Sequence, residues 1–83
     1  MTSPESQDVA RRGLSLYETR LRSLLEPQHR EDYVAIEPDS GDYFLGKTLS
    51  EAIRSARQAH PQRLAFALRV GHSNTIELGV MAR

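Results

Sequence analysis

Apolar residues in the first part of the chain recur every three or four positions, which is the period of an amphipathic α-helix. The stripe that they form comprises Ala10, Leu14, Tyr17, Leu21, Leu24 and Leu25. Ser3 and Pro4 suit the start of a helix, because serine caps free amide groups and proline needs no amide donor at the first helical position. Pro27 is expected to end the helix. The pattern predicts a long N-terminal helix over residues 1–26.

Two short segments in which apolar and polar residues alternate follow this helix, and they predict a β-hairpin. The first strand is expected over residues 33–37 and the second over residues 42–46. The residues between them, Pro38 to Gly41, are typical of a tight turn. Aspartate and serine favour a type I turn, and glycine accepts the left-handed backbone that ends it.

A second helix is predicted from the segment Thr48-Leu49-Ser50-Glu51, which matches a capping box. The helix is expected to end near His60, because Pro61 follows. Small residues on its inward side would let it lie close to a sheet. That inward stripe is Leu49, Ala52, Ile53 and Ala56.

Alternation returns over residues 64–70, and a turn at residues 71–74 leads to a predicted fourth strand over residues 75–80. The order α-β-β-α-β-β predicts an α+β fold in one domain, 1–83, with a helix at 1–26 and a ββαββ unit at 32–81. We expect a four-stranded, mainly antiparallel sheet with the second helix on one face. The other face is semi-apolar and should be covered by the first helix or by a partner. Its residues are Tyr33, Ala35, Tyr43, Leu45, Ala65 and Ala67.

The composition narrows the classes of function. The chain has 83 residues, 11 basic and 11 acidic, and a formal net charge of zero. Binding to a nucleic-acid backbone favours a basic excess, so nucleic acid is not an expected partner. The absence of cysteine excludes disulfides, thiolate nucleophiles and cysteine zinc sites. No apolar run approaches the ~20 residues of a membrane span, and we expect a cytoplasmic protein without a cofactor.

The tripeptide Asp39-Ser40-Gly41 is the one that carries the catalytic carboxylate in aspartic proteases. Glu37 and Asp42 lie close to it, as in a metal-binding loop. The same residues are the usual ones for a turn between two strands. The carboxylates do not match the ligand spacing of an EF-hand calcium loop. The sequence therefore predicts a turn, with no catalytic or metal-binding role.

Two other functions stay open at this point. His72 lies between two predicted strands and could be the general base of a small ribonuclease or another hydrolase, together with Arg69 or Arg57. The basic second helix could bind nucleic acid if Arg54, Arg57 and Arg63 lay on one continuous face. A solvated helix face is the simpler interpretation of the same charges.

Residues 33–72 combine a YVAI strand, a turn with glycine, an aromatic strand, a capped helix and a strand that ends in RVGH. In this segment the chain resembles a group of small uncharacterised bacterial proteins, some of them toxin–antitoxin-like. The resemblance implies a compact, non-enzymatic protein with a binding role. It assigns no functional residue.

The first helix gives the better indication of function, because Val9 and Leu16 lie off its main stripe and the helix is long for so small a sheet. We therefore expect a small non-enzymatic protein–protein interaction module, antitoxin-like in character, that binds another protein or a second copy of itself. The surface would be the first helix, the semi-apolar sheet face, or both. The candidate partner-binding residues are Val9, Leu16, Tyr33, Tyr43, Arg54 and Arg57.

Overall fold

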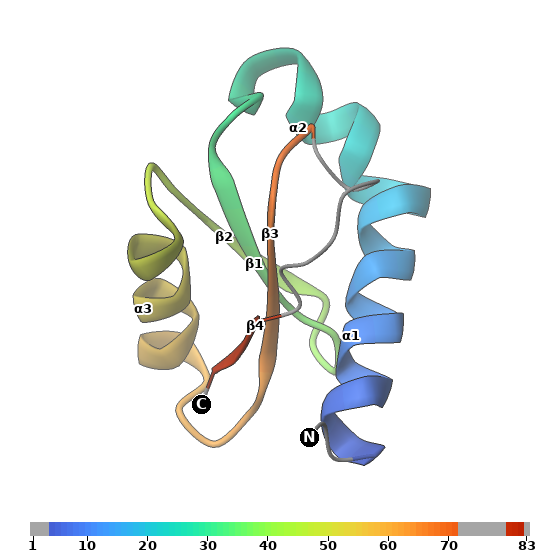
Figure 1. Cartoon of the computed structure of the whole chain (residues 1–83), viewed down its shortest axis with the longest axis vertical. Helices are drawn as coiled ribbons and strands as arrows, with labels where there is room; N and C mark the ends of the chain where they lie inside the picture. The colour runs from blue at the N-terminus through green and yellow to red at the C-terminus, as the bar shows by residue number, and fades with distance from the viewer. Residues whose placement is uncertain (1–3, 72–79, 83) are drawn as a thin grey trace.

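The computed structural model describes residues 4–71 and 80–82, and it shows an α+β fold with an antiparallel sheet between two helical layers (Figure 1). The N-terminal helical run lies on one side of the sheet and the second helix on the other. In chain order the elements are α1 (Pro4–Leu16), η1 (Tyr17–Leu21), α2 (Arg22–His29), β1 (Tyr33–Glu37), β2 (Asp42–Gly46), α3 (Leu49–Ala59), β3 (Ala65–Arg69) and β4 (Val80–Ala82).

Elements α1, η1 and α2 form one helical run, so the predicted long helix is confirmed, but its predicted end is wrong. Pro27 lies inside α2 and does not terminate it. A proline inside a helix removes one backbone hydrogen bond. The turn around it is nevertheless held, because Leu25 is buried and the Glu26 carboxylate lies 3.6 Å from both Arg22 and Arg30.

The π-helical turn η1 changes which side chains face the sheet. Buried positions in the run are spaced by four residues, at Val9, Gly13, Tyr17, Leu21 and Leu25. An α-helix rotates by about 100° per residue, so side chains four positions apart form a row that winds slowly around the helix and away from the sheet. The π turn has more residues per turn, and it brings this row back toward the sheet. Two predictions are wrong as a result. Val9 is 8% exposed and belongs to the core, whereas Leu24 is 58% exposed.

The strand order in the sheet is β2-β1-β3-β4, and every neighbouring pair is antiparallel. The first hairpin forms where the sequence predicts it. The predicted fourth strand over residues 75–80 lies outside the described residues except for Val80, and His72 lies outside them too. The described β4 begins at Val80, which pairs with Ala67 of β3. Among the described strands, β2 and β4 are therefore the two edges of the sheet.

The register corrects the predicted assignment of residues to sheet faces. Val34 pairs with Leu45 and Ile36 pairs with Tyr43, so Tyr43 and Leu45 lie on the face of large apolar side chains. That face packs against the N-terminal helical run, and α3 covers the opposite one. The error arose because the pairing partner of each β2 residue depends on the turn, and a shift by one residue exchanges the faces.

Alanines fill the interface between α3 and the sheet. Ala35, Ala65 and Ala67 of the strands pack against Ala52 and Ala56 of the helix, and none is more than 3% exposed. The semi-apolar sheet face is thus covered within the chain. It is not an open surface for a partner.

Two glycines lie at the closest approaches between the layers. A Cβ at Gly13 would lie 2.8 Å from the Cβ of Phe66, so α1 crosses β3 here without room for a side chain. A Cβ at Gly46 would lie 2.6 Å from the amide nitrogen of Ala52 at the start of α3. Glycine weakens an isolated helix by roughly 1 kcal/mol relative to alanine. At Gly13 this cost is offset, because the missing side chain lets the helix contact the sheet.

The predicted cap of α3 is confirmed. The Glu51 amide donates to the Thr48 hydroxyl at 3.1 Å, and the Glu51 carboxylate accepts from the Lys47 amide at 2.8 Å. The Thr48 hydroxyl thus satisfies one of the amide groups that a helix start leaves unpaired, whereas the Glu51 carboxylate binds the amide one residue before the cap and not the Thr48 amide of a complete capping box.

Candidate functional site

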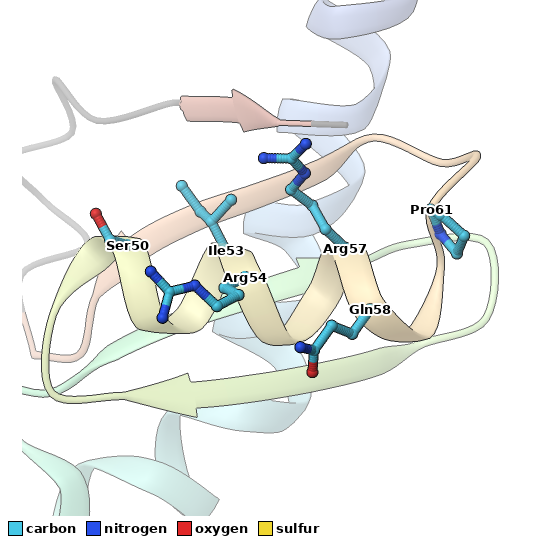
Figure 2. A pocket seen from close by; sticks show the side chains of 6 residues that line it. All are labelled: Ser50, Ile53, Arg54, Arg57, Gln58 and Pro61. Atoms are coloured by element: carbon cyan, nitrogen blue, oxygen red, sulfur yellow. The ribbon is translucent and has the colours of Figure 1, made fainter.

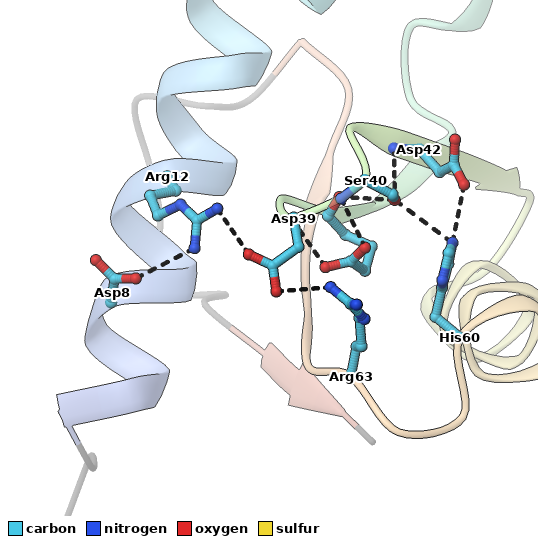
Figure 3. A network of polar contacts seen from close by, with 8 residues as sticks. Asp8, Arg12, Asp39, Ser40, Asp42, His60 and Arg63 are labelled. Atoms are coloured by element: carbon cyan, nitrogen blue, oxygen red, sulfur yellow. Dashed lines mark hydrogen bonds and ion pairs between the residues drawn. The ribbon is translucent and has the colours of Figure 1, made fainter.

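The turn between β1 and β2 has the predicted structure, and its aspartate is tied to two other elements. Gly41 has φ of 80°, in the left-handed region. Figure 3 shows the Asp39 carboxylate between Arg12 of α1 and Arg63, each of which donates a hydrogen bond of 2.8 Å. The bond from Arg12 is the main cause that lowers the pKa of Asp39. An ionised carboxylate between two guanidinium groups does not fit the proton-sharing pair of an aspartic protease.

Glu37 is a structural carboxylate that the sequence analysis treated only as a possible metal ligand. Its side chain is buried, and it accepts backbone hydrogen bonds of 2.9 Å from both Asp39 and Ser40. Burial by itself raises the pKa of Glu37, but the bonds from Ser40 and Asp39 outweigh it, so the pKa lies below its usual value. Glu37 therefore holds the turn from inside.

His60 forms a polar cluster with the turn that resembles catalytic residues in composition but not in geometry. Its Nε2 lies 2.8 Å from Asp42 Oδ2 and 3.4 Å from the Ser40 hydroxyl (Figure 3). A catalytic triad needs the carboxylate and the hydroxyl on different ring nitrogens. With both on Nε2, the cluster ties the end of α3 to the hairpin. The hydrolase alternative that uses His72 concerns a residue outside the described ranges.

The basic residues expected on the second helix do not form one surface. Arg63 is paired with Asp39, and Lys47 lies 3.3 Å from Asp32. Within residues 4–71, Arg54 and Arg57 make no ion pair, and they border an open concave surface of about 540 Å³. Figure 2 shows that their guanidinium groups extend in different directions. Two phosphate contacts are few beside the roughly 6–10 of a salt-sensitive DNA-binding protein.

The candidate partner-binding residues of the first helix and sheet separate into two groups. Val9 is in the core, which corrects its assignment to a peripheral binding surface. Tyr33 is half-buried beside the alanine interface, with the Arg69 guanidinium 5.7 Å from its ring. Leu16 and Tyr43, in contrast, meet at one place on the surface, although 27 positions separate them in the chain.

Leu16 and Tyr43 line a groove between the N-terminal helical run and strand β2, called here the β2 groove. It has a volume of about 200 Å³ and is lined by Leu16, Arg20, Leu21, Leu24, Gly41 and Tyr43. Leu24 and Tyr43 are the two large apolar side chains that are exposed in the described part of the chain, at 58% and 37%. Leu24 was expected in the core. No simple signal in the sequence marks the difference, because two adjacent residues can both lie within the roughly 100° stripe of a core-facing helix.

A second hollow, with more charged residues in its lining, continues along the same strand. It has a volume of about 320 Å³ and is bordered by His29, Asp32, Leu45, Gly46, Lys47 and Glu51. The His29 ring is the main cause that lowers the pKa of Asp32, with Lys47 adding to the effect. Strand β2 is thus flanked by an apolar groove near Tyr43 and by a charged hollow near Lys47.

The backbone of β2 has groups that no described strand pairs with. The Val70 amide donates to the Asp32 carbonyl at 2.7 Å, which places Asp32 in a hydrogen-bonded position opposite β3. In an antiparallel ladder such positions alternate, so Tyr33, Ala35 and Glu37 direct their backbone groups toward β2. Their partners there are Gly46, Phe44 and Asp42. The intervening residues of β2, Tyr43 and Leu45, therefore direct their amide and carbonyl groups outward.

Comparisons with protein-family models, with curated proteins and with solved structures find no match for this chain. The resemblance of residues 33–72 to small bacterial proteins stays a prediction. Among the described residues, no three histidines or carboxylates are grouped as a metal ion requires, and no helix is long and apolar enough to cross a bilayer.

Proposed function

We propose that the protein is a small non-enzymatic interaction module that binds an extended segment of a partner protein along β2 and its groove. One observation carries this proposal. The two exposed large apolar side chains of the described residues, Leu24 and Tyr43, line the same groove beside an edge strand. Exposed apolar side chains that gather beside an unpaired edge are typical of a protein-binding site.

Strand addition explains how such a surface would bind. The outward amide and carbonyl groups of Tyr43 and Leu45 would pair with the backbone of the incoming strand, whatever its sequence. The β2 groove would select an apolar side chain on the face of Tyr43. Five residues of β2 span about 17 Å, so a segment of similar length is sufficient.

One charge beside the groove adds a preference. Arg20 lines the β2 groove, and within residues 4–71 it forms no ion pair. A partner segment with a carboxylate near its groove-binding residue would be favoured. The resemblance of residues 33–72 implies that the module is itself antitoxin-like, and it names no partner.

Peptides selected for binding to the immobilised protein from a random displayed library test this proposal. We expect extended, apolar peptides whose affinity falls at least tenfold for the variant Leu24→Ser/Tyr43→Ser, since each side chain loses its apolar contact. The matched control is Arg54→Ser/Arg57→Ser on α3, which should bind the peptides as the unmodified protein does. Peptides that depend on α3 and ignore Leu24 and Tyr43 would refute the proposed surface.

A further inference from the structure

We infer that the strand accepted by β2 is β2 of a second copy, so that two chains form a symmetric dimer with one continuous sheet. This inference rests on the proposed function, because it uses the same edge and groove and names the partner. Three features carry it: the outward backbone groups, the side chains that would meet, and the charges at the two ends of the strand.

The outward groups limit the register, and among the symmetric pairings that they allow, the one centred on Phe44 overlaps the whole of β2. Tyr43 and Leu45 must occupy the hydrogen-bonded pairs of a new antiparallel ladder. Two copies satisfy this when Tyr43 lies opposite Leu45 of the second copy, because symmetry then repeats the pair in reverse. Phe44 faces Phe44 of the second copy in the intervening non-hydrogen-bonded pair. Each cross-strand contact is then aromatic or aliphatic, which is the favourable kind for a sheet.

The charges agree with this pairing. Asp42 begins β2 and Lys47 follows its end. Antiparallel pairing brings Asp42 of each copy to the end that carries Lys47 of the other, so opposite charges are neighbours at both ends. The formal net charge of each chain is zero, and two copies therefore meet without net repulsion.

After Asp42, strand β2 also lacks proline, charge and a bulge, which are among the features by which edge strands avoid self-pairing. Proteins protect such edges with proline, with charges in the strand or with a bulge. Residues 43–46 are Tyr-Phe-Leu-Gly, without charge or proline. The register with β1 runs without interruption from Asp42 to Gly46, so no bulge bends the strand away.

Symmetry limits the assembly to two chains. The contact uses the same strand of both copies, and once formed it leaves no β2 edge open. A two-fold axis perpendicular to the sheet also places Leu24 and Tyr43 of both copies on one side. The interface is short, so we expect a dimer that dissociates on dilution.

Cysteine cross-linking tests the register directly, because the chain has no cysteine and one introduced thiol can form a disulfide only between chains. In the variant Phe44→Cys the two Cα atoms would lie about 4.5 Å apart, within the range of about 4.4–6.8 Å that a disulfide spans. We expect rapid formation of covalent dimer. Asp42→Cys is the matched control, since its two copies would lie about 13 Å apart along the ladder.

Sedimentation equilibrium tests the dimer without changing Phe44, whose side chain packs near α3. The average mass of the unmodified protein should rise with concentration toward twice the chain mass and stop there. The variant Leu24→Lys/Tyr43→Lys should stay monomeric, while Arg54→Ser/Arg57→Ser should associate as the unmodified protein does.

The outcomes distinguish this inference from the proposed function. A protein that stays monomeric at millimolar concentration, or equal cross-linking at positions 42 and 44, overturns the dimer. The proposed function survives that result if selected peptides still require Leu24 and Tyr43. Growth beyond two chains would also overturn the symmetric dimer, because it indicates head-to-tail pairing of β2 with another edge.

Discussion

Replacing Tyr17 with alanine is expected to lower the free energy of unfolding by about 3–5 kcal/mol, the usual cost of removing a large aromatic side chain from a core. Tyr17 is fully buried where the helical run passes into its π turn. Its hydroxyl donates to the Glu26 carboxylate at 2.8 Å and accepts from the Gly71 amide at 3.0 Å. The side chain thus joins the helical layer to the end of β3.

Urea unfolding of Tyr17→Phe separates the contribution of the hydroxyl from that of the ring, and Tyr43→Ala is the control at an exposed tyrosine. Tyr17→Phe keeps the ring but leaves the Gly71 amide without its acceptor, so a loss of about 1–3 kcal/mol is expected. Tyr43→Ala, at a tyrosine that is 37% exposed, should cost less than about 1 kcal/mol. Equal effects of Tyr17→Ala and Tyr43→Ala would show that Tyr17 is not a core residue.

Replacing Glu37 with glutamine is expected to cost about 2 kcal/mol at neutral pH, because one charged acceptor of two backbone amides in the turn is lost. The measurement is the free energy of unfolding of the two proteins. Glu18→Gln is the matched control, since this glutamate lies on an exposed helix face and should change stability by no more than about 0.5 kcal/mol.

The effect of Glu37 should depend on pH. Its folded-state pKa lies below the unfolded value of about 4.3, so the ionised carboxylate stabilises the fold above that value, and the contribution is lost as the pH falls through the folded-state pKa. The stability difference between the unmodified protein and Glu37→Gln should therefore shrink in acid. A difference that stays constant from neutral pH to pH ~2 would refute the assigned role of the carboxylate.

Features that depend on neighbouring residues were predictable from the sequence. The Thr48 cap needs only Glu51 three positions later, and the turn at residues 38–41 needs only residues that favour its backbone angles. The positions of β1 and β2 followed from the same local pattern. The exchange of the two sheet faces did not, because it depends on which β2 residue lies opposite each β1 residue.

The candidate site was only partly predictable, for a related reason. Leu16 and Tyr43 were both expected at a partner surface, but their meeting depends on how the helical run crosses the sheet. Leu24 was assigned to the core because a regular α-helix would place it there. The π turn at residues 17–21 changes that phase, and the sequence has no simple pattern that identifies such a turn.

Amide hydrogen exchange, followed residue by residue at a concentration at which the free protein is monomeric, and again with a selected peptide bound, tests the central claim that the β2 edge is the binding surface. Binding should slow exchange at Tyr43 and Leu45, whose amides face outward. Exchange at Phe44 should change little, because its amide already faces β1. Unchanged exchange at Tyr43 and Leu45, with new protection on α3, would contradict the account.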